Sequence, residues 1–88
     1  MEIVFLPRAN EDFIFWKKSG NSIIQKKIQK LLIAISESPF NGIGKPEALK
    51  HNLQGKWSRR ISSEHRIIYE VVESESIIKV YSLKGHYH

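Results

Sequence analysis

The chain has 88 residues, no cysteine, and 14 Lys and Arg against 9 Asp and Glu, which gives a formal net charge of +5. This length suits a single domain, residues 1–88, with room for one core and one site. Without cysteine, disulfides and thiolate metal sites are excluded, and a cytoplasmic location is expected. The start, MEIVFLPRANEDF, has neither the basic beginning of a signal peptide nor an apolar run long enough for a membrane span. We therefore expect no membrane partner, and the positive charge favours an anionic one.

The first half of the chain predicts one strand and two helices. Glu2 to Leu6 is short, apolar and rich in residues that favour strands. Arg8 to Lys18 places its aromatic residues at helical spacing, and Gly20 ends this helix. A second helix carries a clear apolar stripe from Ile24 to Ile35, and Pro39 closes it. Because the connection is short, the two helices should form an antiparallel hairpin.

In the second half the apolar period changes to two. The stretch PFNGIGKPEALKHNLQGKW contains three glycines, which predicts a loop with one helical turn at Glu47 to His51. Lys56 to Ile61, Arg66 to Val72 and Ile77 to Lys84 then read as three strands with hairpin-length connections. We predict an α+β domain in which the helical hairpin packs on one face of a twisted antiparallel sheet. Alternation along the middle strand puts Arg66 on the face away from the helices.

Three residues of this chain suit metal-free cleavage of RNA. Such cleavage needs a base for the 2′-OH proton, a cation for the phosphoryl oxygens and an acid for the departing 5′ oxygen. The sequence offers Glu47 and Arg66 at either end of a markedly basic stretch, and His86 after the last strand. Each residue also has a simpler interpretation. Glu47 could favour a helix dipole, Arg66 could pair with Glu64 or Glu70, and His86 could be a plain terminal residue.

Longer motifs favour the functional interpretation. The segments KPEALKHNL, GKWSRRISSEHRIIY and GHY closely resemble the YoeB-type toxins of the RelE/ParE superfamily, and the resemblance extends over nearly the whole chain. It implies a microbial-ribonuclease-like fold and an endoribonuclease that enters the ribosomal A site and cuts the mRNA there. It implies no metal and no other cofactor.

The resemblance also assigns residues. Glu47 matches the family's general base, Arg66 its phosphate-stabilising arginine, His86 its general acid, and Tyr87 its near-terminal active-site tyrosine. Because His88 follows Tyr87 here, the choice between His86 and His88 as the acid rests on motif position. Basic residues in or beside these motifs are expected to contact RNA, namely Lys45, Lys50, His51, Arg59 and Arg60.

The same resemblance implies three partners: the ribosome, through its rRNA and the mRNA in the A site, a YefM-type antitoxin, and a second copy of the chain. Two other functions stay open at this point. A ParE-like protein would inhibit a protein target such as DNA gyrase without nuclease activity. A simple RNA-binding module would need only the basic surface, although the chain lacks a recognisable aromatic platform for base stacking.

Overall fold

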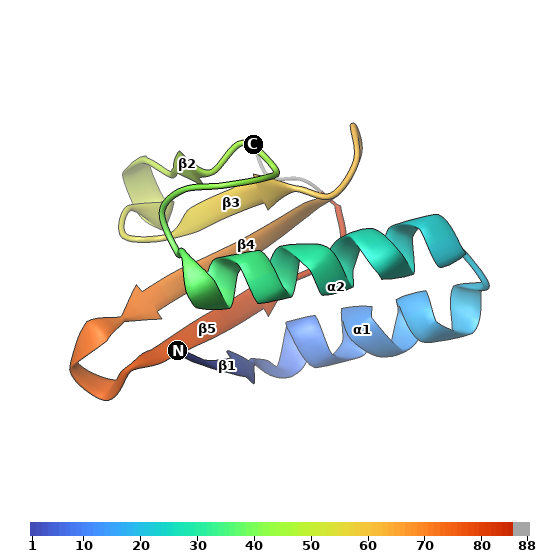
Figure 1. The fold of residues 1–88 in the computed structure, drawn as a ribbon, viewed down its shortest axis with the longest axis horizontal. Coiled ribbons are helices and arrows are strands. Elements are labelled where there is room, and N and C mark those ends of the chain that lie inside the picture. The colour runs from blue at the N-terminus through green and yellow to red at the C-terminus, as the bar shows by residue number, and fades with distance from the viewer. Residues whose placement is uncertain (86–88) are drawn as a thin grey trace.

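A computed structural model of the chain describes residues 1–85. The chain passes through a strand, two helices and four more strands (Figure 1). Both predicted helices and all four predicted strands are confirmed, with ends that differ by at most two residues. The elements are β1 Glu2–Phe5, α1 Pro7–Ser19, α2 Ser22–Glu37, β2 Glu47–Ala48, β3 Trp57–Arg60, β4 Arg66–Val72 and β5 Ile77–Ser82, with short 3-10 turns at His51–Leu53 and Glu73–Glu75.

Local sequence signals set the ends of both helices. Pro7 is the first residue of α1, where its missing N–H costs no helical hydrogen bond. Gly20 ends α1 in the left-handed region, with φ of 72°. Asn21 caps α2, because its side-chain oxygen accepts from the backbone N–H of Ile24 at 3.1 Å. The two helices run side by side in opposite directions, as the short connection predicts (Figure 1).

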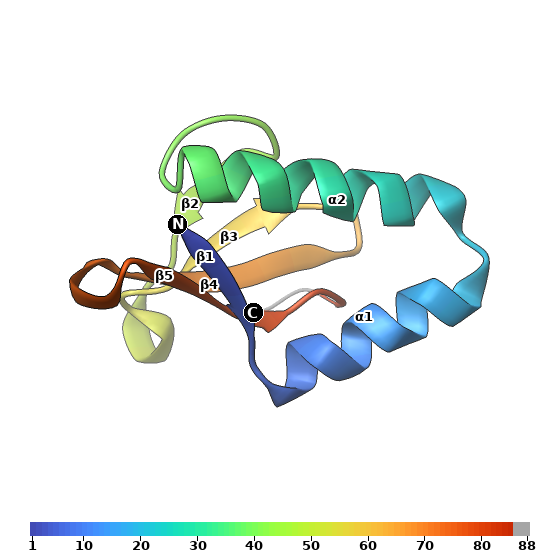
Figure 2. The ribbon, with the colours of Figure 1, turned by 60° about the horizontal axis from the view of Figure 1, so that its bottom comes forward.

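The sheet has five strands in the order β1-β5-β4-β3-β2. Three of its pairings are antiparallel, but β1 runs parallel to β5, with Glu2 opposite Ile77 and Phe5 opposite Val80. The expectation of a wholly antiparallel sheet is therefore wrong. A parallel neighbour needs a long crossover, and here the helical hairpin and the intervening strands supply it (Figure 2).

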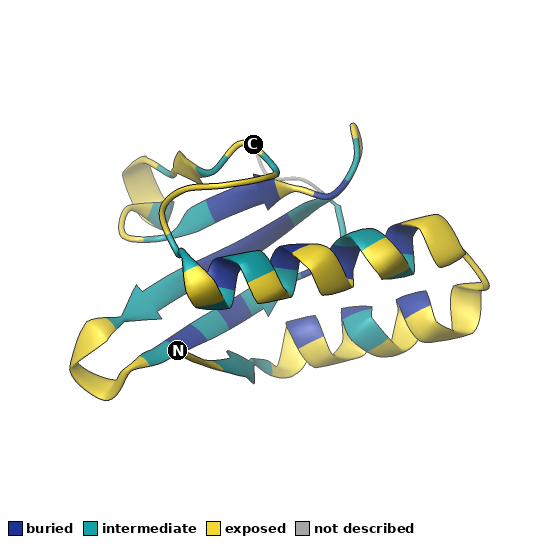
Figure 3. Ribbon diagram, in the orientation of Figure 1, coloured by how far each residue is buried: buried dark blue, intermediate teal, exposed yellow. Residues whose placement is uncertain are grey.

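Both helices cover the same face of the sheet, and the core lies between these two layers (Figure 2). The apolar stripe of α2 meets Ile67 and Tyr69 of β4, which are fully buried. Buried and exposed residues alternate along the helices and strands in the way this packing requires (Figure 3). Arg66 consequently lies on the opposite face of β4, as alternation predicted. Within residues 1–85, no helix combines the length and apolar character needed to cross a membrane.

The segment after the long loop is extended where a helical turn was expected. Glu47 and Ala48 form β2, which pairs with β3 at the edge of the sheet, and Leu49 N donates to Lys56 O at 2.9 Å. The 3-10 turn begins only at His51. The prediction of a helical turn beginning at Glu47 is therefore wrong, because the free edge of β3 offers these residues backbone partners that an isolated turn would lack.

Candidate active site

Three strands bring polar side chains together on the sheet face opposite the helices. β2 places Glu47 opposite Ser58 of β3, and β3 places Arg60 opposite Arg66 of β4. Together with Lys45, these four residues line a hollow of about 200 Å³. The hollow therefore combines one carboxylate with three cations, which is a suitable arrangement for a phosphodiester.

The Arg66 side chain is half-buried and anchored at one end. Its Nη1 donates to the backbone oxygen of Ser62 at 2.8 Å and to that of His65 at 3.2 Å. Within residues 1–85, the only ion pair joins Arg8 to Asp12, so Arg66 is not engaged by a carboxylate of this part of the chain. An ion pair with Glu64 or Glu70 is thus not the role of Arg66 here, and its Nε and Nη2 have no partner among the described residues.

The loop before β2 is held in place by β3, and this positions Glu47. Arg60 N donates to the Gly44 oxygen, and Gly44 adopts φ of 84°. Lys45 also has a left-handed conformation, with φ of 51°. The chain then enters β2 with the exposed carboxylate of Glu47 on the side of the hollow. The Glu47 carboxylate accepts no hydrogen bond and makes no ion pair within residues 1–85, which leaves its oxygens free for a substrate hydroxyl.

Arg59 differs from the other predicted RNA contacts, because it is fully buried. Its Nε donates to the Tyr69 hydroxyl at 3.2 Å, and its Nη1 donates to the Ile43 oxygen at 3.2 Å. Its Nη2 donates to the backbone oxygens of Asn41, at 2.8 Å, and Ser38. The prediction that Arg59 contacts RNA is therefore wrong. Its guanidinium binds the loop that follows α2.

Strand alternation explains why the two adjacent arginines differ. Arg59 lies opposite Ile67, a core residue, whereas Arg60 lies opposite Arg66 on the other face. The buried network extends to Tyr69, whose hydroxyl donates to the Pro39 oxygen at 2.6 Å. Burial raises the pKa of the Tyr69 phenol, and the hydrogen bond and positive charge of Arg59 oppose that rise.

Lys50 and His51 lie apart from the hollow. Both are exposed at the beginning of the 3-10 turn, and neither belongs to its lining. Their predicted RNA contact stays a prediction.

The predicted acid and its neighbours, His86, Tyr87 and His88, lie outside the described residues. The structure does describe the residue directly before them. The Gly85 oxygen accepts a hydrogen bond from the backbone N–H of Arg66 at 2.9 Å, so the last described residue lies beside Arg66. Of the predicted catalytic residues, Glu47 and Arg66 are thus found together, and the roles of His86 and Tyr87 stay predictions.

Two residues near the hollow were not singled out from the sequence. Ser58 lines it with its hydroxyl, and strand alternation applied to β3 would have found it. Lys27 of α2 lines a second hollow of about 320 Å³, which shares Lys45 and Arg60 with the first. No local pattern links α2 to the loop after β3, so sequence periodicity alone could not place Lys27 here.

A separate polar cluster occupies the same sheet face further along β4. The Tyr81 hydroxyl donates to Glu70 Oε1 at 2.6 Å, and Lys56 Nζ lies 4.7 Å from the centre of the Tyr81 ring. The hydrogen bond to Glu70, assisted by partial burial, raises the pKa of Tyr81 to about 12. Among residues 1–85, no three His, Asp or Glu side chains gather closely enough to form a metal site.

Comparison with known proteins reveals a family that shares this chain's length and fold. Residues 5–87 match the family model described as YoeB-like toxin of bacterial type II toxin-antitoxin system. Toxin YoeB of Escherichia coli K12 is 41% identical over 78 residues, which cover 89% of this chain and 92% of that protein.

Solved structures of similar proteins point to the same family. The YoeB/ParE toxin from Agrobacterium tumefaciens superposes with a TM-score of 0.93 at 37% identity, and the match covers 99% of this chain and all of that one. YoeB from Staphylococcus aureus, solved as a dimer and in a YoeB-YefM complex, gives a TM-score of 0.86 in both cases, at 43% and 44% identity. Each of these matches covers 99% of this chain and 98% of the other.

Proposed function

The chain belongs to the YoeB-like toxin family of bacterial type II toxin–antitoxin systems, and from that membership we propose that it is a ribosome-dependent endoribonuclease that cuts mRNA in the ribosomal A site. One observation carries the proposal: Glu47 and Arg66, far apart in sequence, line one small hollow together with Lys45 and Arg60. An inhibitor that only bound a protein such as DNA gyrase would have no need for a free carboxylate and an anchored guanidinium in one place.

Each described residue of the hollow has a role that follows from its chemistry. Arg66 is fixed through Nη1, so its remaining donors can bind the scissile phosphate without first being ordered. Glu47 accepts the proton of the 2′-OH. Lys45 and Arg60 neutralise the phosphates on either side, and Ser58 contributes a hydroxyl to the lining of the hollow.

The proposed reaction is an in-line displacement at phosphorus. The 2′ oxygen bonds to phosphorus as its proton passes to Glu47, and the bond between phosphorus and the 5′ oxygen breaks as His86 protonates that oxygen. Tyr87, which matches the family's near-terminal active-site tyrosine, is the remaining residue of the proposed site. The products are a 2′,3′-cyclic phosphate and a 5′-OH, and no metal or cofactor takes part.

The partners follow from the same membership. We propose that a YefM-type antitoxin neutralises this toxin and that the toxin forms homodimers, because S. aureus YoeB was solved both with YefM and as a dimer. The net charge of +5 favours both rRNA and an acidic antitoxin. A cytoplasmic location and a single domain of residues 1–88 complete the proposal. Co-purification with a co-expressed YefM-type protein tests the antitoxin.

Mapping mRNA 5′ ends on translating ribosomes after induction tests the nuclease. Arg66→Ala should lower the cleavage rate on the order of 10²-fold or more, and Glu47→Gln should lower it by about 10²–10⁴-fold. Glu73→Gln is a matched control, because it makes the same change at an exposed position beyond the opposite end of β4. Equal growth inhibition by wild type, Arg66→Ala and Glu47→Gln would instead favour inhibition by binding.

A further inference from the structure

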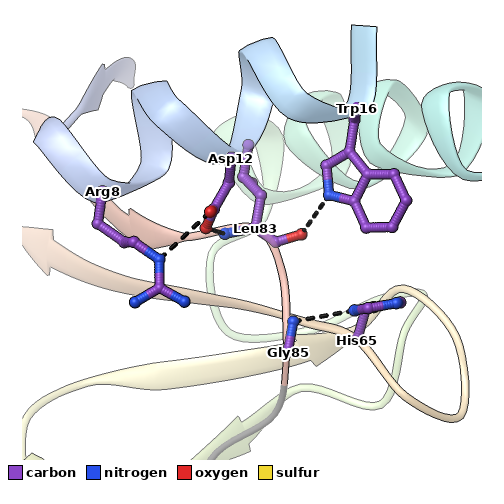
Figure 4. Close-up of polar contacts among 6 residues, drawn as sticks. All are labelled: Arg8, Asp12, Trp16, His65, Leu83 and Gly85. Carbon is purple, nitrogen blue, oxygen red and sulfur yellow. Dashed lines mark hydrogen bonds and ion pairs between the residues drawn. The ribbon is translucent and has the colours of Figure 1, made fainter. Parts of the chain in front are cut away.

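The short segment between β5 and His86 is held by three side-chain hydrogen bonds and by one backbone hydrogen bond from β4. The ladder between β4 and β5 ends where Ile68 lies opposite Ser82. Leu83 follows this last pair and is nevertheless fully buried. Its N–H donates to Asp12 Oδ2 at 2.9 Å, and its oxygen accepts from Trp16 Nε1 at 2.9 Å (Figure 4). Both contacts come from α1, where residues four apart lie on one face.

Gly85 is held in the same way from the other side. Its N–H donates to His65 Nδ1 at 2.9 Å (Figure 4). Its oxygen accepts from the backbone N–H of Arg66 at 2.9 Å. Gly85 has φ of 77°, a conformation that glycine adopts without strain. The two backbone groups of Gly85 are therefore bound by His65 and by Arg66, a residue of the proposed site.

The two sets of contacts form one unit. The Trp16 and His65 rings meet edge to face, with centroids 4.9 Å apart and planes at 82°. Asp12 and Trp16 are only 5% and 6% exposed, so their hydrogen bonds to Leu83 are shielded from competing water. Arg8 Nε, at 3.2 Å from Asp12 Oδ1, orients the carboxylate. We call Asp12, Trp16 and His65 the terminal clamp.

A segment beyond the last strand pair would ordinarily fray, because no continuous ladder holds its backbone. Here four hydrogen bonds fix the backbone of Leu83 and Gly85, and one of them comes from the residue that binds the phosphate. Buried polar groups of α1 that serve only the core would not need to point at this segment.

We propose that Asp12, Trp16 and His65 are positioning residues of the nuclease site, which hold the backbone up to Gly85, the residue directly before His86 in the sequence, against Arg66. The inference rests on the proposed function, in which His86 is the general acid. His65 acts through its Nδ1, which must be unprotonated to accept from Gly85.

Two substitutions of His65 test whether its hydrogen bond to Gly85, rather than the packing of its ring against Trp16, holds this segment. His65→Phe keeps a ring against Trp16 but removes the acceptor, whereas His65→Asn places a side-chain oxygen close to the position of Nδ1. Trp16→Phe is a second variant that removes the donor to Leu83 and keeps an aromatic ring. Thermal unfolding of each variant shows whether it folds.

Two measurements are made on each variant. Amide hydrogen exchange at Gly85 and Leu83 reports the clamp without any cleavage, and single-turnover cleavage on mRNA-programmed ribosomes reports catalysis at saturating toxin. His65→Phe should speed Gly85 exchange and slow cleavage, each roughly tenfold, the factor expected for one lost hydrogen bond. The toxin concentration that gives half-maximal rate should not change. His65→Asn should restore both values to within about threefold of wild type.

Unchanged exchange in His65→Phe would overturn the clamp. Faster exchange with unchanged cleavage would overturn its catalytic role, as would a loss of activity that followed only the melting temperature. Failure of the wild-type protein to cut ribosome-bound mRNA would overturn the proposed function itself, and with it the positioning role. That outcome is distinguishable because it appears in wild type before any clamp residue is changed.

Discussion

The adjacent arginines of β3 give a sharp test of the fold and site together. Arg59→Met keeps an unbranched apolar stem but removes a buried guanidinium that makes four hydrogen bonds. Hydrogen bonds from charged groups contribute about 1.5–3 kcal/mol each, but these four belong to one network and do not add fully. We expect a loss of about 3–5 kcal/mol, a large part of the roughly 5–15 kcal/mol that stabilises a typical domain.

Arg60→Met makes the same chemical change one residue later. The Arg60 side chain is exposed and makes no hydrogen bond or ion pair within residues 1–85. Its backbone N–H donates to the Gly44 oxygen, and the substitution leaves this bond in place. Its effect on stability should stay within about 0.5 kcal/mol, while cleavage falls because the hollow loses a cation. Urea unfolding followed by tryptophan fluorescence measures both free energies. Thermal melting should show a drop of at least about 12 °C for Arg59→Met alone, at about 4–8 °C per kcal/mol.

Equal stability of the two variants would refute this reasoning. It would mean that the Arg59 guanidinium does not hold the loop after α2. Loss of cleavage in Arg59→Met without loss of stability would likewise contradict its structural role, and would return Arg59 to the predicted RNA contacts.

Three other perturbations have local effects of known sign. Glu70→Gln should lower the Tyr81 pKa from about 12 toward the ordinary value of about 10, as ¹³C NMR of labelled tyrosine would report. An unchanged titration would contradict the hydrogen bond. Because folding raises this pKa, the bond stabilises the fold below about pH 10 and is lost as the pH rises through about 12. Gly44→Ala should destabilise by about 2–4 kcal/mol, since its Cβ would lie 2.7 Å from Leu31 Cδ2 at φ of 84°. Gly20→Ala, with φ of 72° and open space, should cost only about 1 kcal/mol, and equal melting of the two would refute the steric explanation. Toxin stripped with EDTA and dialysed should cut ribosome-bound mRNA at an unchanged rate, whereas a loss that added metal restores would contradict the metal-free scheme.

Much of the fold was predictable because its signals are local. The apolar stripe of α2, the left-handed Gly20 and the period-two strands each reflect neighbours within a few residues, and the structure confirms them. Alternation also placed Arg66 on the correct face. The same rule applied to β3 would have separated Arg59 from Arg60, so that error came from the motif rather than from missing information.

The remaining features depend on contacts that leave no local pattern. The parallel pairing of β1 with β5 joins Glu2 to Ile77, and the bond from Leu83 to Asp12 spans 71 residues. Asp12 follows Arg8 by four residues, a spacing typical of an exposed ion pair on a helix, although Asp12 is buried. The β2 strand is only two residues long and exists because β3 offers it an edge. Propensity cannot detect such features, because the stabilising partner lies elsewhere in the chain.

The place of β5 within the sheet has a consequence for how a cell makes this protein. β5 is the last strand in chain order, yet it lies between β1 and β4. A nascent chain that has reached Val72 contains the sequence of both helices and four strands but lacks β5. The strand β1 then has no partner in the sheet, and α1 lacks the strand against which it mainly packs. Assembly must wait until β5 leaves the ribosome tunnel. The translating ribosome therefore carries an unfinished polypeptide, and an antitoxin would first meet a folded toxin only after synthesis has passed this strand.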